Sequence, residues 1–318
     1  LTATACQTRA PYQTVESDEE EMEQSTETQS PTATTTDLPT QEPTESPTPV
    51  PTETPVPEST AIEAMVYTFT MNRITGDTKP EYHPKWSPDG STLAYTRKDE
   101  GFNTNSIMLL TEDNQEAIRL NLDLTGDFAF DWSPDGTQLV LDGYDPDERL
   151  TLFHYDIESA ALTQLFHGDA REGHPAWSPN SNTIVFSRYS DLYLLDLDTM
   201  EESRLTRNEG ENWHPNWSPD GKMLLFTSNR TGNDEVWTMP VEGDEPIQIT
   251  DSDSRDDRAV WSPNGNYIAF ASNRSGNWDV YIHNLNDGEL IQVTEDPGFD
   301  SHPFWHPDGR SLLITSDR

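Results

Sequence analysis

The chain has 318 residues, enough for one large β domain or two ordinary domains. It carries 58 acidic against 19 basic residues, a net charge of −39, and this charge excludes nucleic acid as an expected partner because both surfaces would be negative. The single cysteine rules out an internal disulfide, and no apolar run approaches the roughly 18 residues of a membrane-spanning helix.

Residues 1–10 are predicted to be the end of an export signal with a lipidation site. Ala3-Thr4-Ala5 is a run of small residues typical of a cleavage site, and the sole cysteine, Cys6, follows it directly. This arrangement resembles the lipobox of bacterial lipoproteins, in which the cysteine is lipidated and becomes the mature N-terminus. The resemblance implies an extracytoplasmic protein anchored to the bacterial cell envelope through Cys6. The alternative is a chance cysteine in a disordered end.

Residues 11–61 are predicted to be a disordered spacer. They consist mostly of Thr, Pro, Glu, Ser and Gln, as in "PTATTTDLPTQEPTESPTPVPTETPVPEST". Such a segment has too few branched and aromatic apolar side chains to offset the entropy lost on ordering. Its prolines favour extended polyproline II, at about 3.1 Å per residue, so the spacer would hold the following domain away from the membrane.

A repeated turn organises residues 62–318. The segment "HPKWSPDG" at residues 83–90 recurs as "HPAWSPNS", "HPNWSPDG" and "HPFWHPDG", with looser copies "AFDWSPDG" and "RAVWSPNG". The tryptophans of these copies lie 40 to 46 residues apart, which is the period of a four-stranded propeller blade. Ser-Pro-Asp-Gly is a turn in which Pro presets φ and Gly closes the loop, so each copy predicts a hairpin. The six tryptophans are Trp86, Trp132, Trp177, Trp217, Trp261 and Trp305.

A second repeated position indicates how the ring closes. A threonine eight residues ahead of the repeat recurs at Thr206, Thr250 and Thr294. Thr75 has the same spacing to His83, although no copy of the turn precedes it. We therefore predict an all-β fold, a six-bladed β-propeller in which a strand from residues 64–75 completes the blade that begins at Trp305. Because residues 64–75 are short for two strands, this last blade is expected to have three.

One mouth of the central channel is the predicted ligand-binding site, because the inner strand of every blade begins there. The residues three places before the tryptophans are His83, Ala129, His174, His214, Arg258 and His302. Three residues just before members of this set are aromatic, namely Tyr82, Phe128 and Trp213. The predicted site consists of the four histidines and Arg258, with the three aromatic rings as flat apolar surfaces. The alternative is that His-Pro serves packing, each imidazole bonding a neighbouring loop.

The histidines also predict a pH response. The ordinary pKa of histidine is about 6.5, so slight acidification would protonate the ring of imidazoles. Positive charge would then appear on an otherwise acidic protein. Binding of an acidic peptide or a uronic-acid sugar is therefore expected to strengthen as the pH falls toward 6.

The repeat as a whole resembles that of a known propeller family. The pattern "HPxWSPDG…IAFASNRSGNWDVYI…QVT" is similar to the WD40-like (PD40) repeat of the TolB propellers, over roughly residues 64–318. The resemblance implies the propeller fold. The chain departs from TolB itself, because a lipidation signal and a spacer stand in place of the small α/β domain that precedes that propeller.

Two functions are compatible with these residues. The first is a monomeric, membrane-tethered module that binds a protein or peptide and needs no cofactor. The second is a saccharide-binding protein or a metal-dependent polysaccharide lyase, since the oligogalacturonate lyases are propellers that hold a metal with channel histidines. No base for proton abstraction can be assigned, and no Gly-x-Ser-x-Gly elbow of a serine hydrolase occurs. We therefore predict the binding module, with no catalytic residue and no bound metal.

Two other patterns have structural interpretations. Arg230 and Arg274, in "SNRTGNDE" and "SNRSGNWD", are expected to hold neighbouring turns through carboxylate or carbonyl oxygens. The segment "DSDSRDD" has no glycine at its sixth position and no closing glutamate, so it does not fit a calcium loop. We interpret it as a solvated acidic loop. Its acidic residues are Asp251, Asp253, Asp256 and Asp257.

Overall fold

The computed structural model describes the backbone of residues 2–7 and all of residues 69–75, 79–100, 105–111, 116–122, 124–126, 128–207, 210–243 and 245–318. These residues form six four-stranded sheets and no helix, so the predicted all-β propeller is confirmed. The predicted spacer, residues 11–61, lies outside the described residues. Among the residues described, none forms a helix of the length and apolarity that a membrane crossing requires.

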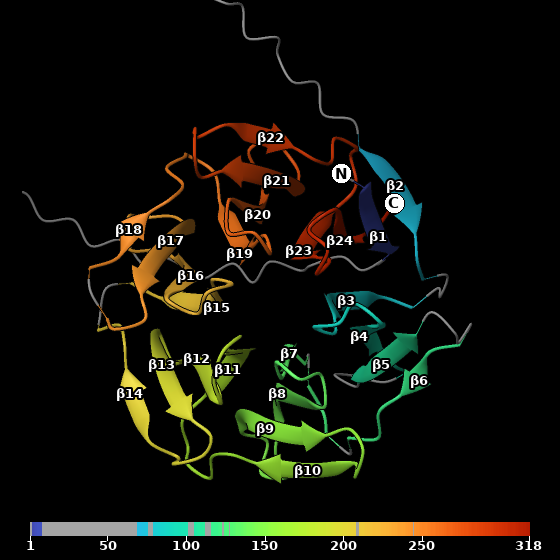
Figure 1. The fold of residues 1–318 in the computed structure, drawn as a ribbon, viewed down its shortest axis with the longest axis vertical. Coiled ribbons are helices and arrows are strands. Elements are labelled where there is room, and N and C mark those ends of the chain that lie inside the picture. Colours follow the sequence, from blue (N-terminus) through green and yellow to red (C-terminus); the bar gives the residue numbers. More distant parts are fainter. Residues whose placement is uncertain are drawn as a thin grey trace, which may run out of the picture. The chain divides into compact units, whose positions relative to one another are not determined.

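Five sheets are blades of four consecutive strands, which follow one another around the channel in Figure 1. The first blade contains β3 (Glu81–Trp86), β4 (Thr92–Lys98), β5 (Asn105–Thr111) and β6 (Ile118–Arg119). The second blade contains β7 (Phe130–Trp132), β8 (Gln138–Tyr144), β9 (Leu150–Asp156) and β10 (Ala161–Gln164). The third blade contains β11 (Glu172–Trp177), β12 (Thr183–Arg188), β13 (Asp191–Asp196) and β14 (Glu202–Arg204). The fourth blade contains β15 (Asn212–Trp217), β16 (Met223–Ser228), β17 (Glu235–Pro240) and β18 (Ile247–Gln248). The fifth contains β19 (Asp256–Trp261), β20 (Tyr267–Ser272), β21 (Asp279–Asn284) and β22 (Leu290–Gln292).

The sixth sheet joins the two ends of the described chain. From the outside inward it contains β2 (Thr70–Arg73), β1 (Thr2–Gln7), β24 (Ser311–Ser316) and β23 (Asp300–Trp305). Closure by a strand from residues 64–75 is confirmed, because β2 lies in that range. The expected count of three strands is wrong, because β1 lies between β24 and β2 and runs parallel to both, with Cys6 opposite Thr315. The segment "TATACQ" gave no signal for this strand, because it lacks alternating large apolar side chains.

The repeated turn forms as predicted. In its first copy, the Gly90 N–H donates to the Ser87 carbonyl over 2.8 Å, and the Ser87 hydroxyl donates to Asp89 over 2.6 Å. Gly90 has a φ of 74°, in the left-handed region that glycine adopts without steric cost. A Cβ at Gly90 would also lie 2.9 Å from the His306 ring of the last blade. The turn therefore fixes the hairpin and allows neighbouring turns to approach.

The core consists of apolar side chains between neighbouring blades. Residues 139–141 in β8 are all fully buried, because successive side chains point to opposite faces and both faces of the blade are covered. At the point of closure, Leu93 and Met108 of the first blade pack against Leu313 of the last. The core therefore continues from the last blade to the first.

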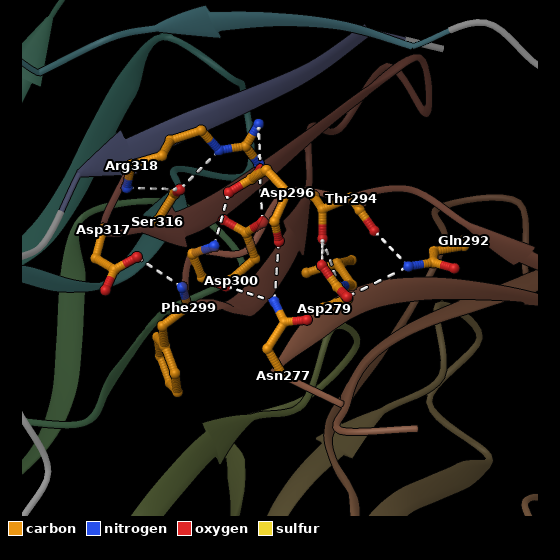
Figure 2. Close-up of polar contacts among 12 residues, drawn as sticks. Asn277, Asp279, Gln292, Thr294, Asp296, Phe299, Asp300, Ser316, Asp317 and Arg318 are labelled. Atoms are coloured by element: carbon orange, nitrogen blue, oxygen red, sulfur yellow. Dashed lines mark hydrogen bonds and ion pairs between the residues drawn. The ribbon is translucent and has the colours of Figure 1, made fainter. Parts of the chain in front are cut away.

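A polar pair recurs at the end of the inner strand that lies nearest the predicted binding site. The first residue of the inner strand is buried and contacts an arginine at or just after the end of the second strand. The pairs are Glu172–Arg188, Asn212–Arg230, Asp256–Arg274 and Asp300–Arg318. Figure 2 shows the last pair, in which Arg318 also contacts Ser316 and Asp296. The structural role predicted for two of these arginines is therefore confirmed.

Candidate binding site at one mouth of the channel

Six equivalent residues, one from each blade, surround a cavity on the propeller axis. They are His83, Ala129, His174, His214, Arg258 and His302. The cavity has a volume of about 90 Å³, and the residues that follow these six also line it, among them four prolines. The innermost strands in Figure 1 carry or directly follow the six residues. The structure thus brings together all five polar residues of the predicted mouth.

The backbone is left-handed at five of these six positions. His83, His174, His214, Arg258 and His302 have φ values between 49° and 55°. At the same place, the pairing of inner and second strands shifts register, so each of these inner strands contains a bulge. A left-handed conformation costs a non-glycine residue about 1–2 kcal/mol, and such strain is concentrated at functional sites. The bulges let these side chains face the cavity.

Three of the four imidazoles are tied to the protein through Nδ1. His83 Nδ1 lies 3.1 Å from the Phe128 carbonyl, and His214 Nδ1 lies 2.7 Å from the Asp257 carboxylate, both in a following blade. His174 Nδ1 lies 3.1 Å from the Ser187 hydroxyl. His302 Nδ1 is buried and, in the described part of the chain, has no hydrogen-bond partner. The rings also pair edge to face, His83 with His302 at 4.6 Å between centroids and His174 with His214 at 4.3 Å. These contacts hold neighbouring blades together, as the packing alternative requires.

Asp257 is the centre of a charged cluster at the same mouth. Its carboxylate accepts hydrogen bonds from His214, from the Thr227 hydroxyl at 2.8 Å and from Arg258 Nη1 at 2.6 Å. Burial opposes its ionisation, yet the neighbouring His214 and Arg258 hold the pKa of Asp257 well below its usual value. Asp257 is therefore an anion that fixes the positions of both neighbours.

The pKa values of all four imidazoles are lowered, and the main cause is burial. The positive charge of Arg258 lowers them further. The pKa of His83 falls to about 3. The rings therefore take up protons less readily than free imidazoles, which argues against the expectation that they gain charge near pH 6.5.

The three predicted aromatic residues do not line the cavity. Phe128 is 1% exposed and belongs to the core between the first two blades. Tyr82 and Trp213 are half-buried on β3 and β15, and neither lines the cavity although each directly precedes a histidine that does. Only the Phe128 carbonyl contributes to the mouth, as the partner of His83.

A partly buried ion pair deeper in the channel was missed by sequence reasoning. Lys85 lines the cavity, and its Nζ lies 2.9 Å from Asp131 of the next blade. Both side chains are less than one fifth exposed. Residues two apart in a strand share a face, so the position two after His83 was the signal that could have identified Lys85.

The acidic segment "DSDSRDD" divides into two parts. Asp251 and Asp253 are exposed, as predicted for a solvated loop. Asp256 and Asp257 are buried and paired with Arg274 and Arg258, so the interpretation is wrong for these two. Throughout the described ranges, no group of three or more His, Cys, Asp or Glu side chains is arranged to hold a metal ion.

The repeated turns surround the opposite mouth of the channel. All six tryptophans and the proline that follows each line a second cavity, of about 340 Å³. The Trp217 indole donates to the Ala176 carbonyl of the preceding blade at 3.0 Å. The tryptophans are mostly buried, so the turns serve packing. At this mouth a histidine occurs in the turn of the last copy alone, where the His306 ring lies 5.1 Å from that of Trp86.

Comparison with family models identifies the C-terminal blades. Residues 187–272 and 257–318 match the TolB beta propeller domain, PD40. Residues 187–318 are therefore similar to the TolB propeller family, as the repeat predicted. A curated relative, an uncharacterized protein of Agrobacterium fabrum, is 26% identical over 166 residues, which cover 52% of this chain and 42% of the relative. The match thus spans less than half of that relative's length.

Solved structures show the same fold. The structure of a putative TolB from Agrobacterium tumefaciens is 22% identical, with a TM-score of 0.65, over 76% of this chain and 91% of that chain. An oligogalacturonate lyase in complex with manganese is 18% identical, with a TM-score of 0.56, over 76% of this chain and 75% of that chain. At these identities the likeness extends to the fold alone.

Proposed function

We propose that this chain is an extracytoplasmic, membrane-tethered module that binds a protein or peptide at the histidine-lined mouth of its channel. The observation that carries the proposal is a break in the repeat. Where four blades place a histidine, the fifth places Arg258, preceded by Asp257, and this pair is bonded to His214 at the cavity wall. Residues that are repeated in every blade serve packing. A charged residue that replaces the repeated one and lines a cavity is suited to recognising a polar group.

The size of the cavity favours a polypeptide as the ligand. Pockets that enclose a whole small molecule have volumes of roughly 300–1,000 Å³. The cavity at this mouth has about 90 Å³, which suits one side chain or a chain end. A partner would then insert a single group and rest the remainder of its surface on the surrounding loops. A relative described as a putative TolB shares this propeller, which is consistent with the proposal. No contact in the described residues favours the saccharide alternative.

The first test concerns the mouth. Replacing Arg258 by alanine is expected to abolish capture of envelope proteins by the immobilised chain, because a donor in the cavity wall is lost. Lys222 provides the matched control, since it is exposed in the turn before β16, near the opposite mouth. Its replacement by alanine should leave capture unchanged, as measured by quantitative mass spectrometry of the bound fraction. Equal capture by all three proteins would place the partner elsewhere.

The second test concerns the tether. Expressed in a bacterium with an upstream export signal, the chain is expected to partition with membranes, and Cys6→Ser is expected to move most of it to the soluble envelope fraction. Two acyl signals give stable anchoring, whereas the acidic propeller would be repelled by anionic lipid. The measurement is the partition ratio after washing with high salt. Unchanged membrane association of the Cys6→Ser protein would contradict lipidation.

Lipidation has a consequence for the last blade. Cleavage before Cys6 removes residues 2–5, which are four of the six residues of β1. The processed protein would then lose most of the strand that lies between β24 and β2. Comparison of hydrogen exchange in β24 between processed and Cys6→Ser chains would show this difference directly.

A further inference from the structure

The partners of two imidazoles fix which ring nitrogen carries the proton. His83 Nδ1 faces the Phe128 carbonyl, and His214 Nδ1 faces the Asp257 carboxylate. A carbonyl and a carboxylate can only accept a hydrogen bond, so Nδ1 must be the donor in both rings. Both rings therefore carry their proton on Nδ1.

The same assignment holds for a third ring. The Ser187 hydroxyl lies 3.1 Å from His174 Nδ1 and donates to the Gly173 carbonyl over 2.9 Å. A hydroxyl has a single hydrogen, so Ser187 can only accept from His174. His174 is therefore also protonated on Nδ1.

This arrangement leaves three acceptors at the cavity. A neutral imidazole has one N–H, so Nε2 of His83, His174 and His214 carries a lone pair. All three rings line the cavity, and within the described residues none of the three Nε2 atoms has a hydrogen-bond partner. The mouth therefore presents acceptors, although its composition suggests a site for anions.

Arg258 adds a donor to the same wall. Its Nη1 is bonded to Asp257, its other side-chain N–H groups have no hydrogen-bond partner among the described residues, and the side chain, 25% exposed, lines the cavity. The other cation, Lys85, is bonded to Asp131 deeper in the channel. The two cations are thus each balanced by a carboxylate, and the cavity carries little net charge.

We infer that the mouth binds a primary carboxamide, the side chain of an Asn or Gln residue of the partner. Its NH₂ group donates to the lone pairs on Nε2, and its carbonyl accepts from Arg258. A carboxylate would place its own lone pairs against those of the rings, and an ammonium group would leave Arg258 without an acceptor and lie beside two cations. This inference rests on the proposed function, since it names the group that the partner inserts.

The tautomers are tested first. Long-range proton–nitrogen NMR correlations at pH 7 should show Nδ1–H and unprotonated Nε2 for His83, His174 and His214. In Ser187→Ala, only His174 should change, while Ser203→Ala, an exposed serine on β14, should change none of them. An Nε2–H tautomer in any two of the three rings would overturn the inference.

The ligand chemistry is tested with three probes of similar size, propionamide, propionate and propylammonium. Propionamide should shift the Nε2 resonances saturably and bind at least about tenfold more tightly than either ion, and Arg258→Ala should weaken it about tenfold. Equal affinity for propionate and propionamide, or no saturable shift with propionamide, would overturn the inference.

The affinities of these probes are measured independently of partner capture. If capture depends on Arg258 but propionate binds more tightly than propionamide, only the carboxamide inference is contradicted. If propionamide binds but Arg258→Ala leaves capture unchanged, only the proposed function is contradicted.

Discussion

Replacing Arg318 by alanine is expected to lower the free energy of unfolding by about 3–5 kcal/mol, because it leaves a buried carboxylate without its cation. Asp300 is fully buried, and its carboxylate lies 2.8 Å from Arg318 (Figure 2). Burial raises the pKa of Asp300, while a hydrogen bond from Ser316 and the charge of Arg318 oppose that rise. Without the guanidinium, the carboxyl group becomes protonated or draws water into the blade. Urea unfolding at pH 7 measures the loss.

Two other variants make this test specific. Arg310→Ala removes an exposed arginine from the turn of the same blade, and a change within about 0.5 kcal/mol is expected. Arg318→Lys keeps the charge but loses the planar guanidinium that contacts Asp296 and Asp300 together. Its free energy of unfolding should therefore lie between those of Arg318→Ala and Arg310→Ala. Equal stability of Arg318→Ala and Arg310→Ala would mean that the buried pair contributes nothing.

Lowering the pH from 6.5 to 5 is expected to destabilise the propeller steeply. The unfolded chain binds protons at histidine below about pH 6.5. The folded chain binds fewer protons at His83, His174, His214 and His302, because burial lowers their pKa values, that of His83 to about 3. The stability of the folded state is therefore greatest above pH 6.5 and is lost as the pH falls. Each such histidine contributes a loss of up to about 1.4 kcal/mol per pH unit.

Single variants isolate one histidine at a time. His83→Gln cannot be protonated, so its free energy of unfolding should fall less steeply, by about 1.4 kcal/mol per pH unit. His167→Gln, at an exposed position, should keep the slope of the parent. The measurement is the unfolding free energy at several pH values between 5 and 7. A slope unchanged by His83→Gln would show that this imidazole takes up its proton in the folded state too.

The fold was predictable where the information is local or repeated. The Ser-Pro-Asp-Gly turn is decided by its own four residues, and the spacing of the tryptophans repeats it six times. The register of Thr75 relative to His83 was enough to place β2 in the last blade. Strand β1 was not predictable, because it pairs with residues 311–316 and its sequence, TATACQ, has no alternation of large apolar and polar residues. Pairing over such a distance depends on an edge that exists only in the folded ring.

The candidate site was predictable in position but not in chemistry. The repeat placed the histidines and Arg258 around one cavity. It did not reveal the bulges at the other five positions, and it did not show that the ring of Phe128, directly before Ala129, lies in the core. The lowered pKa values also depend on burial and on Arg258 from another blade. The sequence shows a histidine, whereas its charge and its protonated nitrogen are set by residues far away along the chain.

The joining of β1 to β24 also sets the order of events during synthesis. Five blades consist of consecutive strands, so each can fold as it leaves the ribosome. The sixth cannot, because β1 emerges first and pairs with β24, more than 300 residues later. At about 5–20 residues per second, the first strand waits roughly 15–60 s for its partner. Contacts between such distant residues slow folding, so in the unprocessed chain we expect closure of the ring by β1 to be the last step of folding.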